Sequence, residues 1–170
     1  MKKVIFWSAI AALFLALLEA AVLSNITILP ALPDLVLLLV VYVALKNGSA
    51  AGCTCGFLAG MILDFVSAAP LGLNAMTKTI TGFLLGKFHA SFNLQRPFIP
   101  FLAAAAATVL KAVLVWILSF FFGEEILRYR VLSAVLWFET AANAVCAPLL
   151  FKLLDAFSPL FIRKNRDTAS

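Results

Sequence analysis

The chain has 170 residues, 64% of them hydrophobic and 12% charged, with a mean hydropathy of +1.08. Soluble domains are roughly half apolar, so this composition excludes a soluble globular protein and indicates an integral membrane protein surrounded by the lipid bilayer. The formal net charge is +5, but the basic residues stand at segment ends without a basic stripe or interleaved aromatic residues, which argues against nucleic acid as a partner.

Six apolar segments are predicted to form an all-α, compact bundle of transmembrane helices. They cover residues 4–24, 32–45, 48–66, 71–88, 98–122 and 131–154. The first segment follows a signal-like Met1-Lys2-Lys3 but has no A-x-A cleavage site, so we expect it to remain as a helix. We expect residues 1–157 to form a single polytopic transmembrane domain and residues 158–170 to form a basic cytoplasmic tail.

The second segment is opened by Pro33 and Asp34, which suit first-turn positions because they offer a missing N–H and a negative charge. It is only about 14 residues long. A helix of that length falls short of a bilayer, so we expect it to be shielded by neighbouring helices or tilted at one interface.

Basic residues at the segment ends predict the orientation. Two of them, Arg128 and Arg130, fall on one side of the membrane. Nine fall on the other: Lys2, Lys3, Lys46, Lys87, Arg96, Lys152, Arg163, Lys164 and Arg166. Since positive charge accumulates on the cytoplasmic side, both termini are predicted to be cytoplasmic.

Glycines dominate one face of the third segment. Gly48, Gly52, Gly56 and Gly60 recur at intervals of four, and the next step of four reaches Asp64. Such a stripe permits close helix packing in a membrane, either within the fold or against another protein. A carboxylate at its end must lie in headgroup water, in a polar cavity or opposite a partner. A second small-residue face, formed by Ala12, Ala16 and Ala20, lies in the first segment.

Four charged residues lie inside the predicted helices: Glu19, Lys78, Lys111 and Glu139. A rise of about 1.5 Å per residue puts all four at one level, roughly 10 Å below the outer surface of a core of about 30 Å. Two acids and two bases at one depth predict mutual neutralisation. This buried charge layer is interpreted either as an ion-pair network that fixes helix packing or as a polar pocket for a ligand or a proton path.

No catalytic, metal or cofactor site is assigned. The only histidine, His89, lies in a predicted loop, and neither a nucleophile–base pair nor a G-x-S-x-G stretch occurs. Cys53, Cys55 and Cys146 lie in apolar segments without further ligands, which is typical of small buried thiols.

Several motifs occur in an informative order. The chain has Pro33-Asp34, Tyr42, the glycine run with Phe57, Asp64, Leu71-Gly72 and Gly82. In these motifs it resembles the bacterial rod shape-determining MreD family, most strongly over residues 33–86. The matching residues are Pro33, Asp34, Gly52, Gly56, Phe57, Gly60, Asp64 and Gly72.

The resemblance implies a non-enzymatic, multi-pass component of the bacterial inner membrane that acts in cell elongation. Its implied partners are the membrane-anchored protein MreC and an elongation complex with MreB, RodA and a penicillin-binding protein. Through these partners the family links the MreB cytoskeleton to peptidoglycan synthesis.

A second interpretation remains open. The family is similar to the substrate-binding subunits of energy-coupling-factor vitamin transporters, in which a small-residue face of the first helix docks the coupling subunit. The stripe of Ala12, Ala16 and Ala20 fits that alternative. A vitamin-binding subunit should present a roomy outer pocket lined by aromatic and polar groups, whereas a scaffold should fill that space with its own side chains.

Overall fold

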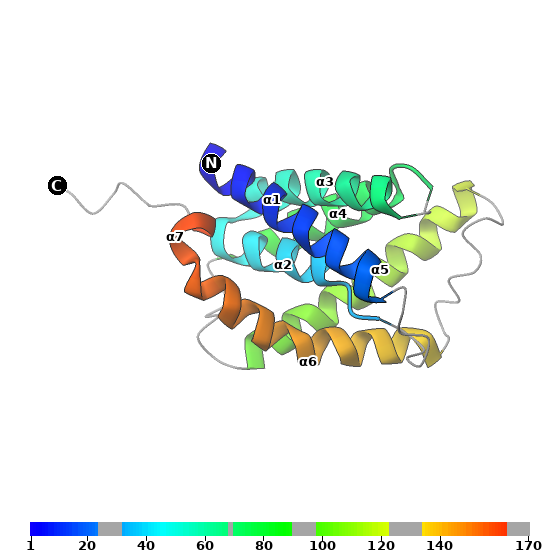
Figure 1. The fold of residues 1–170 in the computed structure, drawn as a ribbon. Coiled ribbons are helices and arrows are strands. Elements are labelled where there is room, and N and C mark those ends of the chain that lie inside the picture. The colour runs from blue at the N-terminus through cyan, green and yellow to red at the C-terminus, as the bar shows by residue number, and fades with distance from the viewer. Residues whose placement is uncertain (24–31, 68–69, 90–97, 123–133, 163–170) are drawn as a thin grey trace.

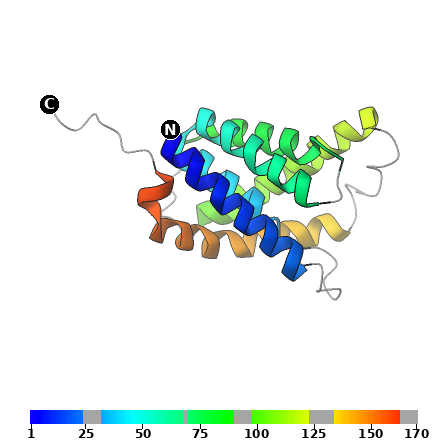
Figure 2. The same cartoon turned by 45° about the horizontal axis from the view of Figure 1, so that its top comes forward.

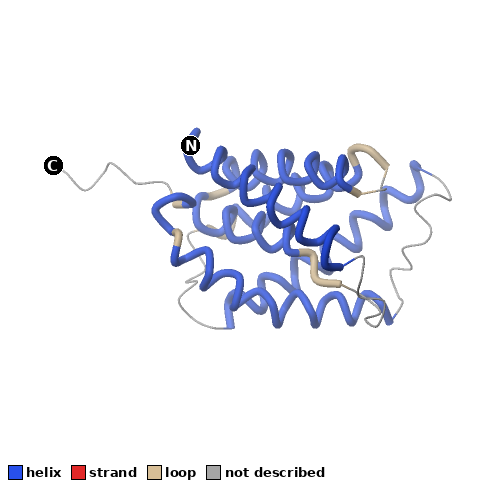
Figure 3. Tube along the Cα trace, viewed as in Figure 1, coloured by secondary structure: helices blue, strands red, loops and turns tan. Residues whose placement is uncertain are grey.

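The computed structural model describes residues 1–23, 32–67, 70–89, 98–122 and 134–162, and the regular secondary structure of these residues is helical throughout (Figure 3). The prediction of an all-α bundle is therefore confirmed. The elements are α1 (Lys2–Leu18), the π-helical turn η1 (Glu19–Leu23), α2 (Leu35–Asn47), α3 (Ser49–Val66), α4 (Leu73–Gly86), α5 (Phe98–Phe122), α6 (Ala134–Ala156) and α7 (Ser158–Phe161).

The described helices include three stretches that are long and apolar enough to cross a membrane, namely Lys2–Ala21, Ser49–Val66 and Phe98–Phe120. α2 is apolar but shorter, with 13 residues. The six predicted segments correspond to α1 to α6, with ends that differ by a few residues. The first segment differs most, because α1 ends at Leu18 and the chain continues from Glu19 as the wider π-helical turn η1.

α2 forms the centre of the bundle. Every residue from Val36 to Ala44 is fully buried, and α2 contacts α1, α3, α4, α5 and α6 (Figure 1). Because neighbouring helices rather than lipid surround it, α2 does not need the length of a bilayer span. Of the two expectations for this short helix, shielding by its neighbours is the one observed.

α3 and α4 are antiparallel and make the most extensive contact between elements in the described residues (Figure 2). Glycine sets the closeness of this contact. A Cβ atom on Gly52 would collide with the backbone of Gly82, and one on Gly56 would collide with the backbone of Lys78. The stripe on α3 therefore packs inside the fold, against α4.

The chain turns sharply from α2 into α3 at Gly48. This residue has φ +90°, in the left-handed region that favours glycine, and its N–H donates to the carbonyl of Ala44 at 2.8 Å. The turn places α3 directly beside α2, so the glycine face of α3 lies next to the centre of the bundle.

α5 and α6 pair with each other, and both contact α2. α7 follows α6 and packs against α1, so the N-terminus and α7 lie at the same end of the molecule (Figure 1). The tail is predicted to begin at residue 158, which is the first residue of α7. Phe161 is buried and joins the hydrophobic core, while residues 163–170 lie outside the described residues.

Candidate functional site

Asp34 is the centre of a buried polar network at the start of α2. Its Oδ1 caps the helix by accepting from the Leu37 N–H at 2.7 Å. Its Oδ2 accepts from two ammonium groups, Lys78 Nζ of α4 at 2.9 Å and Lys111 Nζ of α5 at 2.8 Å. One carboxylate thus joins three helices.

The network extends to α6 through Lys111, whose Nζ also donates to Glu139 Oε1 at 2.8 Å. The Lys78 side chain is 0% exposed, that of Asp34 8% and that of Glu139 6%. Charged groups so far from water are stable only when each meets an opposite charge or a hydrogen-bond partner. These contacts therefore decide how α2, α4, α5 and α6 fit together.

A neutral arm completes the network. The backbone N–H of Asp34 donates to Asn143 Oδ1 at 2.7 Å, and Asn143 Nδ2 donates to Thr108 Oγ1 at 2.9 Å. Thr108 in turn donates to the Ala104 carbonyl one turn earlier in α5. Asn143 and Thr108 are fully buried, so these bonds satisfy groups that water cannot reach.

Glu19 approaches the same helix start from η1. Its Oε1 accepts from the Val36 N–H at 3.0 Å, so two carboxylates, Glu19 and Asp34, serve the N-terminus of α2. Within the described residues Glu19 forms no ion pair. Its contact is with the backbone of α2.

The structure thus rearranges the predicted charge layer. It brings Lys111 and Glu139 into direct contact, whereas Lys78 meets them only through Asp34. The sequence predicts Asp34 in the first turn of α2, without a basic partner. It is instead the N-cap, with both lysines on one of its oxygens.

Asp64, at the end of the glycine stripe, caps the neighbouring helix. Its Oδ2 accepts from the N–H groups of Gly72 at 2.9 Å and Ala75 at 3.1 Å, and its Oδ1 accepts from the Asn74 N–H at 3.0 Å. The partner expected for this carboxylate is therefore the N-terminus of α4. Gly72 has φ +92° and open space around its Cβ position, so backbone conformation rather than crowding favours glycine there.

The small-residue face of α1 is largely covered by the chain itself. Ala12 and Ala16 are fully buried, whereas Ala20 is exposed. α1 packs on α3 and α2, so the predicted stripe serves contacts within the bundle over most of its length.

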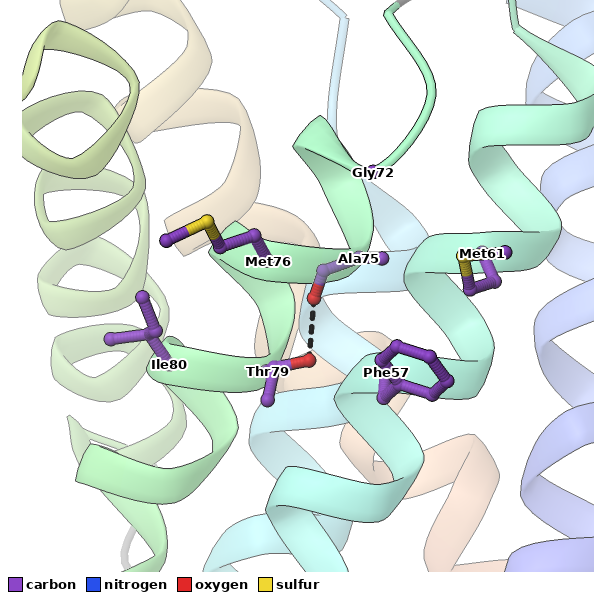
Figure 4. A pocket seen from close by; sticks show the side chains of 7 residues that line it. All are labelled: Phe57, Met61, Gly72, Ala75, Met76, Thr79 and Ile80. Atoms are coloured by element: carbon purple, nitrogen blue, oxygen red, sulfur yellow. Dashed lines mark hydrogen bonds between the residues drawn. The ribbon is translucent and has the colours of Figure 1, made fainter. Parts of the chain in front are cut away.

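Phe57 is the one matching residue of the glycine run that faces outward. It is 50% exposed and lies on the side of α3 that borders a groove of about 360 Å³ (Figure 4). The groove has an almost wholly apolar lining from α3, α4 and the turn before α4: Phe57, Met61, Gly72, Ala75, Met76, Thr79 and Ile80. The Thr79 hydroxyl donates to the Ala75 carbonyl, which satisfies it within α4 (Figure 4).

A second polar cluster ties α2 to α6 at the opposite end of α2. Asp155 accepts from the Tyr42 hydroxyl at 2.8 Å and pairs with Lys46 at 2.9 Å. The Tyr42 ring makes edge contacts with Phe151 and Phe161. The sequence pattern around Tyr42 gives no sign of these contacts with α6 and α7.

The described residues contain no cluster of three or more histidine, cysteine or acidic side chains that could hold a metal ion. The polar groups of the network are directed at one another. What the arrangement can do is to fix the relative positions of the helices.

Comparison with known proteins shows to which family this chain belongs. The model of one protein family, described as rod shape-determining protein MreD, matches residues 1–157. The searches of curated proteins and of solved structures gave no match. Since the family model covers nearly the whole chain, this membrane protein belongs to the MreD family and has a role in rod-shape determination.

Proposed function

We propose that the protein is a non-enzymatic scaffold of the cell-elongation machinery. It spans the bacterial inner membrane several times, with both termini in the cytoplasm, and binds an MreC-like membrane-anchored protein. Through a complex with MreB, RodA and a penicillin-binding protein, it links the cytoskeleton to peptidoglycan synthesis. Membership of the MreD family supports this proposal.

The observation that carries the proposal is the occupied interior. Asp34, Lys78, Lys111 and Glu139 point at one another from four helices, and each is largely or fully withdrawn from solvent. A binding subunit would keep polar groups available for its ligand, whereas a scaffold uses them to fix its helices. The network therefore favours a scaffold over a carrier.

The alternative is a substrate-binding subunit of an energy-coupling-factor vitamin transporter. Two observations weigh against it. The groove beside Phe57, which the described residues form, is apolar and open, unlike a pocket that would orient a vitamin by polar contacts. Ala12 and Ala16, which would dock a coupling subunit, are buried within the chain.

The groove beside Phe57 is the best-supported surface for a partner span. The glycines of α3 are occupied by α4, so they cannot also receive another helix. The outward face of the same helix pair offers Phe57, Met61 and Met76 as apolar contacts around a hollow. A transmembrane helix that packs by shape can use such a surface.

Substitution of Phe57 tests this proposal. We expect Phe57→Ala to remain folded in detergent but to lose most co-purification with the MreC-like protein and to give rounded cells. Phe65→Ala is the matched control, because Phe65 lies on the same helix, is 73% exposed and does not line the groove. Normal capture and normal shape in Phe57→Ala would reject the groove as the docking surface. Loss in both variants would mean that exposed aromatic residues of α3 act through general membrane anchoring.

A further inference from the structure

The end of the molecule that holds the N-terminus and α7 carries exposed basic and apolar side chains together. We name this surface the basic corner and define it by six exposed residues from the start of α1, the end of α6 and the N-cap of α7: Lys2, Lys3, Phe6, Lys152, Leu153 and Phe157. α7 follows α6 directly and packs on α1, which brings the two helix ends to one end of the bundle (Figure 1).

The charge of this corner is not balanced by described residues around it. Asp155 is the acidic residue of α6 at this end, and it already pairs with Lys46 and accepts from Tyr42. A surface of this charge attracts anionic groups.

The exposed apolar side chains of the basic corner indicate which anionic partner it binds. Phe6 is 62% exposed, Leu153 57% and Phe157 54%, and each lies within a few residues of an exposed lysine. A soluble acidic partner would leave these side chains unmatched, whereas a membrane interface takes apolar groups into the acyl region and lysines at the headgroups.

We propose that the basic corner selectively binds anionic phospholipid headgroups. The apolar side chains enter the acyl region, and the ammonium groups of Lys2, Lys3 and Lys152 contact the lipid phosphates. Each basic residue near a surface favours anionic lipid by about fivefold. The proposal does not depend on the elongation partners, because purified protein and lipid are enough to test it.

Tryptophan fluorescence provides a local measurement. The chain has three tryptophans, of which Trp7 lies one turn beyond Lys3, while Trp116 and Trp137 lie elsewhere, late in α5 and early in α6. The Trp116→Phe, Trp137→Phe form of the full chain leaves Trp7 as the only reporter. It is reconstituted in phosphatidylcholine vesicles that contain increasing mole fractions of either brominated phosphatidylglycerol or brominated phosphatidylcholine.

We expect brominated phosphatidylglycerol to quench Trp7 at a several-fold lower mole fraction than brominated phosphatidylcholine. Changing Lys2, Lys3 and Lys152 to glutamine should bring the ratio of the two mole fractions that give equal quenching close to one. Changing all three to arginine should preserve this ratio. Lys87→Gln is the control for a basic residue outside the basic corner, because Lys87 follows α4 and lies over the Phe83 ring. It should leave the ratio unchanged.

Three results would overturn the proposal. Equal quenching by the two lipids would reject lipid selectivity and leave an acidic protein segment as the occupant. A ratio unaffected by the triple glutamine variant would place the selectivity elsewhere. An equal loss in Lys87→Gln would show that basic residues outside the basic corner set the preference.

Discussion

A single carboxylate, Asp34, satisfies backbone and side-chain groups from different helices at once. It caps α2 and neutralises Lys78 and Lys111. If it were absent, two ammonium groups would lose an acceptor in a region with little water, while Lys111 would keep Glu139. The position therefore demands a short acidic side chain, since it must reach its own helix and both lysines.

The ion pairs predict which substitutions depend on each other. Lys111→Met should destabilise the protein by about 3 to 5 kcal/mol, because it removes a base from two buried carboxylates. Glu139→Gln should lower the free energy of unfolding less in the Lys111→Met variant than in the parent protein. In that variant the Glu139 carboxylate has already lost its ion pair with Lys111. Thermal unfolding of the two single variants and the double variant in detergent measures this coupling.

The pair Lys78→Met and Glu139→Gln provides the comparison. These two side chains share Asp34 and Lys111 as intermediates but form no direct ion pair in the described residues. Their coupling should be smaller than that of Lys111 with Glu139. Equal coupling in both pairs, or additive losses in both, would contradict the observed connectivity.

The place of Asp34 could have been deduced from helix length. α2 has 13 residues and is about 20 Å long, so if its C-terminal end lies at the predicted cytoplasmic surface, its start at Asp34 lies about 10 Å below the outer side of a 30 Å core. That is the depth predicted for Glu19, Lys78, Lys111 and Glu139. Depth alone, however, cannot tell which acid meets which base, because pairing depends on how the helices are rotated about their axes. Glu19 illustrates this limit, since it bonds the backbone of α2 instead of a lysine.

At the scale of elements, the α3–α4 pair shows why the glycine stripe predicts packing well. Gly52, Gly56 and Gly60 leave one face of α3 without side chains, and Gly82 and Gly86 do the same on α4. The glycine faces of α3 and α4 allow the two backbones to pack in direct contact, and the four-residue spacing of the glycines on each helix predicts this contact. The capping of α4 by Asp64 was not predicted, because it depends on a turn through Gly72 that the spacing does not specify.

Gly56→Leu tests the internal role of this interface. Its side chain would enter the space taken by the backbone of Lys78, so α4 must move and carry the Lys78 ammonium away from Asp34. Overpacking costs about 1 to 3 kcal/mol, and loss of the ion pair adds to it. We expect a large fall in thermal stability, with cell shape and partner binding lost together.

Ala50→Leu is the matched control for that variant. Ala50 lies on the same helix but is exposed, so a larger side chain should be accommodated without loss of stability. A Gly56→Leu protein that is as stable as the parent but fails to capture its partner would instead assign the glycine face to docking. Full stability and full capture would mean that neither role is correct.

At the scale of the whole molecule, the apolar segments predict the helices and their order because membrane spans are long and strongly patterned. The sequence does not reveal which helix lies at the centre. α2 takes that place although it is short, since five other helices cover it. α7 was also missed, because four residues carry no periodic signal and its position depends on the contact of Phe161 with Tyr42.

The orientation of the molecule is the last prediction. The start of α1, the end of α2 and α7 lie at one end, as shown by the contacts of α7 with α1 and of Asn47 with the Phe161 carbonyl. Nine basic residues are assigned to this side and two to the other, so it should face the cytoplasm. Reporters fused after Asn47, Arg96 and Ser170 should therefore be active only in the cytoplasm, whereas one fused after Gly123 should report the outside. An external signal at Ser170 together with a cytoplasmic signal at Asn47 would contradict this prediction. It would require an odd number of membrane crossings between the two residues, whereas the end of α2 and α7 lie at the same end of the molecule.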